Sequence, residues 1–179
     1  MDQLRGTCLK RFLRDWRRAH PIQRQVALVL QSVAYPVNVG SAFRIADATG
    51  VRKIVLCGIT PTPPNKTILQ VGRGKDRGVE WRYEERAEDA VTALRAEGYY
   101  IVALEITDSC QPYYAVDYPD RVCLVLGNED HGVTRSVLSR CDTSVFVPMY
   151  GKGKSLTVHV SAAVVLYHLI HQSYVSGGG

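Results

Sequence analysis

The sequence lacks the features that mark membrane, secreted and zinc-binding proteins. No apolar run approaches the length of a membrane span, and residues 1–20 lack the apolar segment of a signal peptide. The five cysteines are scattered, odd in number and without a C-x-x-C pair, which argues against a disulfide framework or a structural zinc site. We therefore expect free thiols in the core, no bound metal and a cytoplasmic protein.

Positive charge is present but unevenly placed. The formal net charge is +5, and residues 1–20 hold six basic side chains against two acidic ones, so most of the excess sits there. Such asymmetry is typical of a protein with a polyanionic partner, and equally of a solvated helix face. Composition alone leaves both interpretations open.

Hydrophobic periodicity predicts an α/β domain. Short continuous apolar runs alternate with helical patterns, which favours a mainly parallel sheet with helices on both faces, in three layers. We predict a basic N-terminal helix within residues 1–20, one domain over 21–174 and a flexible tail over 175–179, with a long irregular stretch at 58–79. The predicted strands are 26–30, 53–58, 99–107, 121–127 and 142–149; the predicted helices are 4–18, one that stops at Gly50, 86–97 and one that starts near Ser155.

Two glycine-rich loops are poor matches to nucleotide-binding motifs. In "VPMYGKGKSL", Pro148 stands where a phosphate-binding loop needs its first glycine, and proline offers no N–H to a phosphate. In "GRGKDRG", residues 72–78, the glycine spacing differs from that of a dinucleotide site, which favours a flexible basic loop. His168 and His171 have no clear third metal ligand, so we predict surface or interface histidines.

Three predicted strands run into polar turns, "LEITDS", "LGNEDHG" and "VPMYGKGKSL", and the last two of these contain glycine. The carboxyl ends of parallel strands lie at one edge of the sheet, where α/β folds bind ligands. These turns offer many backbone N–H and C=O groups and few fixed charges. The pattern favours a polar ligand that carries an adenine and a short tail, rather than a triphosphate.

Three longer segments resemble a known family. Residues 36–51, 124–138 and 145–169 are similar, in content, order and spacing, to the three motifs of the SpoU branch of SPOUT methyltransferases. The resemblance covers residues 5–172. In addition, "LKRFLRDWRRAHP" is similar to the basic N-terminal helix of the TrmH group, which methylates tRNA.

The resemblance implies an α/β fold with a C-terminal trefoil knot, a homodimer, S-adenosylmethionine as methyl donor and a ribose 2′-hydroxyl of RNA as acceptor. It also implies that small residues, Ser161 and Ala162, let the last helix pack closely. Matched residue by residue, it places the donor mainly against backbone groups of Leu104, Gly127, Val147, Met149, Ser155 and Leu156.

The resemblance also implies a catalytic set of Arg44, Asn38 and Glu129. Arg44 would stabilise the negative charge that develops on the ribose oxygen, or a substrate phosphate would help to accept the proton. Without the motifs, Arg44 would be a surface arginine, Asn38 a helix N-cap and Glu129 an acid near a helix N-terminus. One departure is notable: Thr157 and His159 stand where the family usually has asparagine and a small polar residue.

We therefore expect an RNA 2′-O-methyltransferase that acts on tRNA. Ribosomal RNA is the alternative substrate, and a catalytically silent RNA-binding homologue is the alternative class. A membrane-surface or organellar-targeting role for the first helix is disfavoured, because Asp2 and Asp15 interrupt its basic face. The predicted phosphate contacts are Arg11, Arg14, Arg17 and Arg18 in the first helix and Arg73, Lys75 and Arg77 in the glycine-rich loop.

Overall fold

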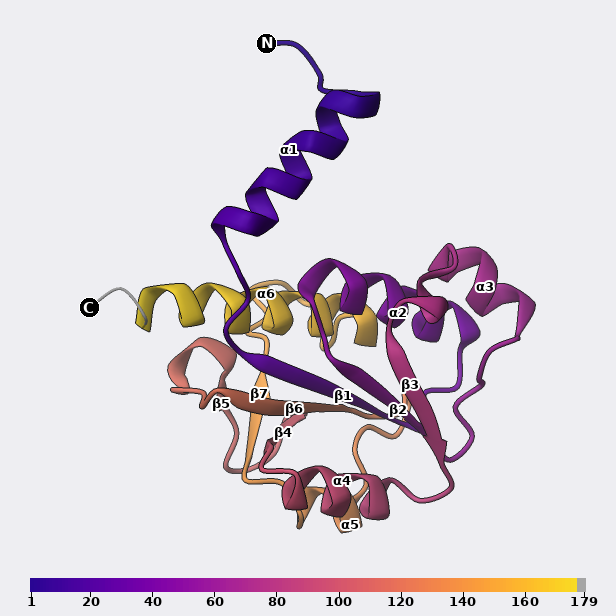
Figure 1. Cartoon of the computed structure of the whole chain (residues 1–179). Coiled ribbons are helices and arrows are strands. Elements are labelled where there is room, and N and C mark those ends of the chain that lie inside the picture. The colour runs from indigo at the N-terminus through magenta and orange to yellow at the C-terminus, as the bar shows by residue number, and fades with distance from the viewer. Residues whose placement is uncertain (177–179) are drawn as a thin grey trace.

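The computed structural model describes residues 1–176 and contains a seven-stranded sheet of order β3-β2-β1-β6-β4-β7-β5, in which every neighbouring pair is parallel (Figure 1). The strands are β1 Gln25–Gln31, β2 Lys53–Cys57, β3 Glu80–Glu84, β4 Tyr100–Leu104, β5 Gln111–Pro112, β6 Arg121–Leu126 and β7 Thr143–Phe146. The helices are α1 Gly6–Ala19, α2 Pro36–Thr49, α3 Lys66–Gly72, α4 Ala87–Ala96, α5 Arg135–Leu138 and α6 Val158–Ser176, with 3-10 turns η1 Lys75–Arg77 and η2 Tyr113–Ala115.

The central strands divide the core into two layers. Successive side chains of a strand point to opposite faces, so Leu28 and Leu30 pack with Phe43 and α6, whereas Ala27 and Val29 pack with α4. Figure 1 shows α2 and α6 covering one face of the sheet and α4 and α5 the other. The predicted three-layer, mainly parallel α/β architecture is confirmed.

Helix α1 stands apart from this body (Figure 1). It buries no side chain, although its apolar residues follow the predicted helical stripe. Its base is held by Trp16, whose ring stacks 3.9 Å from that of His20, and by the Tyr174 hydroxyl, which donates to the His20 carbonyl at 2.9 Å. Within residues 1–176, no helix is both long and apolar enough to span a bilayer.

The prediction of an irregular stretch over residues 58–79 is wrong. It contains α3 and η1, and the "GRGKDRG" segment begins at the last residue of α3 and continues through η1. Asn65 caps α3 by accepting hydrogen bonds from the backbone N–H groups of Thr67 and Ile68, and the Ile68 side chain is fully buried. The next strand, β3, was not predicted, because "EWRYE" at the edge of the sheet carries charged and half-exposed side chains.

Smaller corrections concern the last third of the chain. The last helix begins at Val158, three residues after Ser155, and the Thr157 carbonyl accepts a hydrogen bond from the Ser161 N–H at 3.1 Å. The predicted tail over 175–179 begins inside α6, and its last three residues lie outside the described residues. Of the two histidines predicted to lie at a surface or an interface, His171 is exposed, whereas His168 is half-buried, with its ring packed edge-on against those of Tyr113 and Tyr118.

Candidate active site

A cavity of about 680 Å³ opens at the carboxyl ends of β4, β6 and β7. These strands are neighbours in the order β6-β4-β7, so the three turns picked out in the sequence lie together. The cavity has the size typical of small-molecule and cofactor sites. All six residues expected to contact a methyl donor line it: Leu104, Gly127, Val147, Met149, Ser155 and Leu156.

The turn after β6 forms one wall of the cavity and depends on Gly127. A Cβ atom at this position would overlap the backbone of Gly132 and Val133, so no side chain fits. The turn is closed by two backbone hydrogen bonds, from the Asn128 N–H to the Gly132 carbonyl at 3.1 Å and from the Gly132 N–H to the Asn128 carbonyl at 2.9 Å. The absence of a side chain at Gly127 therefore lets the chain fold back on itself beside the cavity.

Glu129, in the same turn, is tied to the start of α2. Its carboxylate accepts hydrogen bonds from the backbone N–H of Ala34 at 2.8 Å and of Tyr35 at 3.3 Å, and from Asn38 Nδ2 at 2.6 Å. Burial alone would raise the pKa of Glu129, but these hydrogen bonds together bring it below its ordinary value. Glu129 is therefore an anion at neutral pH, and both Glu129 and Asn38 line the cavity.

Asn38 connects the first and second motif segments to the third. It is 6% exposed, and its Oδ1 atom lies 2.8 Å from His159 Nδ1, in the first turn of α6. The N-cap of α2 is Tyr35, so Asn38 is not a capping residue. The family resemblance had placed Asn38 and Glu129 in one site; the contact of Asn38 with His159 was missed, because 121 residues separate the two.

Arg44 is not brought into the cavity. It lies on α2 less than two turns after Asn38 and is exposed to solvent. By contrast, Glu105 was missed by sequence reasoning and lines the cavity, where its carboxylate accepts the backbone N–H groups of Val133 and Ile106, each at 2.9 Å. Its place directly after an apolar strand was the signal that could have identified it.

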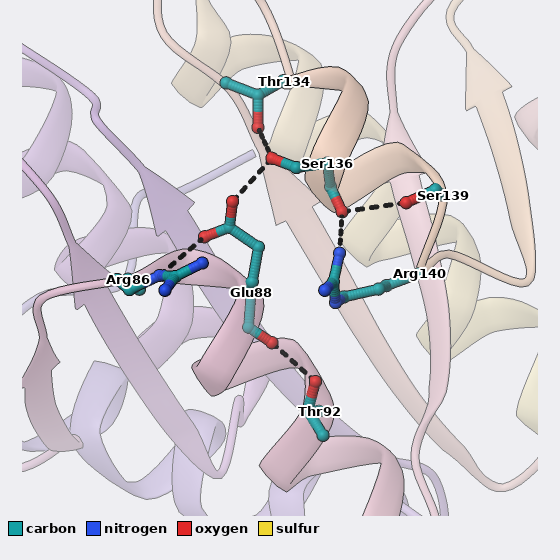
Figure 2. Close-up of polar contacts among 7 residues, drawn as sticks. All are labelled: Arg86, Glu88, Thr92, Thr134, Ser136, Ser139 and Arg140. Carbon is teal, nitrogen blue, oxygen red and sulfur yellow. Dashed lines mark hydrogen bonds and ion pairs between the residues drawn. The ribbon is translucent and has the colours of Figure 1, made fainter.

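A polar cluster on the far face of the sheet fixes the segment that follows the turn (Figure 2). The Ser136 hydroxyl donates to Glu88 at 2.5 Å, which joins α5 to α4 and lowers the pKa of Glu88. Thr134 lies beside Ser136, and its backbone N–H donates to the side chain of Gln31, at the end of β1, at 3.0 Å. These contacts therefore anchor the chain on the carboxyl side of the turn that carries Glu129.

The predicted phosphate-binding residues occupy two exposed surfaces. Arg73 and Arg77 are exposed at α3 and η1, whereas Lys75, between them, is paired with Asp47 of α2 at 2.7 Å. The other four predicted phosphate-binding residues are all exposed on α1: Arg11, Arg14, Arg17 and Arg18.

Within residues 1–176, no three His, Cys, Asp or Glu side chains are arranged to hold a metal ion.

Comparison with known families gives one match over most of the chain. The family described as SpoU rRNA Methylase matches residues 25–167. A tRNA (guanosine(18)-2′-O)-methyltransferase of Escherichia coli K12 is 28% identical over 155 residues, which are 87% of this chain and 67% of that protein. A 23S rRNA (guanosine(2553)-2′-O)-methyltransferase of Bacillus subtilis is 31% identical over 142 residues, or 79% of this chain and 56% of that protein.

Solved structures agree on the fold. The TrmH/SpoU tRNA modifying enzyme of A. aeolicus superposes with a TM-score of 0.78 at 24% identity, over 94% of this chain and 86% of that one. An AdoMet-bound rRNA methyltransferase of Sinorhizobium meliloti gives a TM-score of 0.77 at 25% identity, over 86% of this chain and 58% of that one. The chain thus spans between just over half and most of the length of these relatives.

Proposed function

The chain belongs to the SpoU methylase family, and from this premise we propose that it transfers a methyl group from S-adenosylmethionine to a ribose 2′-hydroxyl of tRNA. The observation that carries the proposal is the cavity, because six residues chosen from the family resemblance line it together with Asn38 and Glu129. The named activities of both curated relatives are 2′-O-methyl transfer to guanosine in RNA.

The cavity suits the methyl donor chemically. Apolar side chains of Leu104, Val147 and Leu156 offer contact to an adenine ring, and the turn at Gly127 leaves backbone groups accessible. The donor supplies a methyl group on a positively charged sulfur, which needs no metal for transfer. The chain's own residues have to bind it, orient it and bring the RNA oxygen into line.

Arg44 is the residue that we propose to act on the ribose. The 2′-hydroxyl would lose its proton as its oxygen bonds to the methyl carbon and the bond from that carbon to the donor sulfur breaks. A nearby guanidinium would stabilise the negative charge on the oxygen. A phosphate of the substrate would serve as the proton acceptor, since arginine stays protonated at neutral pH. Because Arg44 is exposed on α2, this role requires RNA to lie across that helix.

The surface supports two further parts of the proposal. Exposed apolar residues occur on α2 and α6, where a second copy of the chain would cover them in a homodimer: Val37, Val160 and Tyr167. The basic side chains of α1 and of the α3–η1 segment would contact RNA phosphates.

We also propose that residues 21–174 form the methyltransferase domain and that this domain contains the family's C-terminal knot. The enzyme is proposed to be cytoplasmic, in keeping with its five free cysteines.

A tRNA substrate is favoured over ribosomal RNA by the basic helix α1, which is similar to that of the TrmH group. To test this, the purified protein is incubated with methyl-labelled donor and, separately, with unmodified tRNA and ribosomal RNA, and the labelled nucleosides are identified. We expect a 2′-O-methylated nucleoside from tRNA. Label in ribosomal RNA alone would change the substrate, and failure to bind the donor would favour the silent homologue.

A further inference from the structure

His159 is a half-buried titratable side chain for which the proposed reaction has no use, yet it lies where the three motif segments meet. Its Nδ1 atom is 2.8 Å from Asn38 Oδ1. Asn38 in turn donates to Glu129, and Glu129 holds the two backbone N–H groups of Ala34 and Tyr35. One chain of hydrogen bonds therefore runs from the start of α6, through α2, to the turn after β6 and back to the segment before α2.

The direction of each hydrogen bond follows from the groups involved. An ionised carboxylate only accepts, so the Asn38 amide must turn its NH₂ group toward Glu129. Its oxygen then faces His159, and an amide oxygen also only accepts. The proton must therefore be on Nδ1 of His159, which leaves Nε2 as the unprotonated nitrogen of the neutral ring. Burial lowers the pKa of His159, which is consistent with a neutral imidazole at pH 7.

The position of His159 gives it control over Asn38. Asn38 is buried, so without a donor at position 159 its oxygen would lose a hydrogen bond that water cannot readily replace. Loss of that contact would free the amide to rotate, and the bond to Glu129 depends on its orientation. Asn38, Glu129 and Tyr35 all line the cavity, whereas His159 itself does not.

We propose that His159 is a positioning residue for the methyl-transfer site: its Nδ1–H holds the Asn38 amide in the one orientation that lets Asn38 bind Glu129 and so shape the cavity wall. This rests on the proposed function for its catalytic consequence, but not for the hydrogen-bonded arrangement. A small polar residue, which the family usually has here, is too short to make the same contact, so this chain supports its asparagine differently.

The test compares two substitutions that separate the donor from the ring. His159→Phe keeps the ring and removes the donor, while His159→Asn keeps a donor close to the place of Nδ1. His171→Phe, on the same helix but exposed, is the matched control. We expect His159→Phe to lower kcat on tRNA about 10-fold with a smaller change in KM for the donor, and His159→Asn to restore most of the loss. Should His159→Phe not fold, His159→Ser replaces it in the test, because the serine side chain is smaller than histidine and its hydroxyl is too short to donate a hydrogen bond to Asn38 Oδ1.

Two results would overturn the proposal. One is a kcat of His159→Phe equal to that of His171→Phe; the other is a loss that His159→Asn fails to restore, which would assign the role to ring packing. The arrangement is also measured without any reaction, by nitrogen NMR of the histidine rings and hydrogen exchange of the Asn38 side-chain amide. We expect protonated Nδ1, and slow exchange that His159→Phe abolishes.

These measurements distinguish the two proposals. A wild-type protein that methylates no RNA, but shows protonated Nδ1 and a protected Asn38 amide, would remove the proposed function and leave the hydrogen-bonded arrangement standing. An active wild-type protein with protonated Nε2, or with an Asn38 amide that exchanges as fast in the wild type as in His159→Phe, would do the reverse.

Discussion

The cavity wall and helix α1 differ in how their side chains are held. Around the cavity, residues far apart in sequence are joined by buried hydrogen bonds, and the central one, Asn38, is 6% exposed. Helix α1 has a strongly amphipathic pattern and yet buries no side chain. Its large apolar residues are each 40% to 55% exposed: Leu9, Phe12, Leu13 and Trp16.

This difference matches what each region has to do. A methyl donor and a ribose oxygen must be aligned closely, and alignment requires side chains whose orientation is fixed by their neighbours. A surface that tracks RNA phosphates needs positive charge more than fixed geometry, because phosphate contacts carry little sequence information. Changes at the cavity should therefore alter catalysis and stability, whereas changes on α1 should alter RNA binding alone.

The largest effect is expected from Arg44→Ala. Removal of a group that stabilises charge in the transition state typically lowers kcat about 100- to 1,000-fold. Because the Arg44 side chain is exposed, the melting temperature should stay close to that of the wild type. The control is Arg52→Ala, an exposed arginine beyond the C-terminal end of α2. Near-normal turnover of Arg44→Ala in a labelled-methyl assay would contradict the proposed role.

Gly127→Ala should damage the cavity itself. A Cβ atom would overlap the backbone of Gly132 and Val133, so the turn must shift, at a cost of about 1–3 kcal/mol in the free energy of unfolding. Donor affinity should fall as well, as measured by calorimetry. Gly78→Ala is the control, since a Cβ atom there would make ordinary contact at 3.8 Å. Equal stability and donor affinity of the two variants would show that the turn is not tightly constrained.

Removing positive charge from α1 should leave donor binding and the melting temperature unchanged, because α1 buries no side chain. tRNA affinity should fall, and the slope of log affinity against log salt should become shallower by up to about 3. The variant replaces Arg11, Arg14, Arg17 and Arg18 with alanine. Arg86→Ala combined with Arg135→Ala, on the opposite face of the sheet, is the control; an equal loss there would place the RNA surface elsewhere.

The smallest effect concerns pH. Burial lowers the pKa of His159 in the folded state, so between the folded and unfolded pKa values the folded chain binds fewer protons at His159 than the unfolded chain does. Its stabilising contribution is complete above the unfolded pKa of about 6.5 and is lost as pH falls through the lower folded pKa. The melting temperature should therefore decline less steeply below pH 6.5 in His159→Asn than in the wild type. An identical decline would mean that His159 does not contribute.

The sheet and the cavity residues could be predicted from sequence because they rest on local signals. Continuous apolar runs predicted the central strands, and the motif loops predicted Gly127, directly after β6, and Ser155, in the loop between β7 and α6. Segment 58–79 could not be predicted, since its order comes from the Asn65 cap and the burial of Ile68. Edge strand β3 carries the charged residues that protect a sheet edge, and these hide the strand pattern.

Contacts between residues that are far apart in the sequence could not be predicted either. The hydrogen bond from His159 to Asn38 joins two residues that are 121 positions apart in the sequence, and no local pattern indicates it. The motifs did indicate that Asn38 and Glu129 belong to one site. They did not indicate that Arg44 would face solvent, because its motif does not reveal which face of α2 is packed.

The most direct test of the central claim uses a tRNA identical to the methylated one but lacking a single oxygen. Once the modified nucleotide is known, the same tRNA is synthesised with a 2′-deoxyribose at that position and incubated with enzyme and labelled donor. The account predicts no label in the deoxy tRNA and unchanged binding of both donor and tRNA. Label at the same nucleotide in the deoxy tRNA would mean that the methyl group goes to the base, which would contradict the assignment of a ribose 2′-O-methyltransferase.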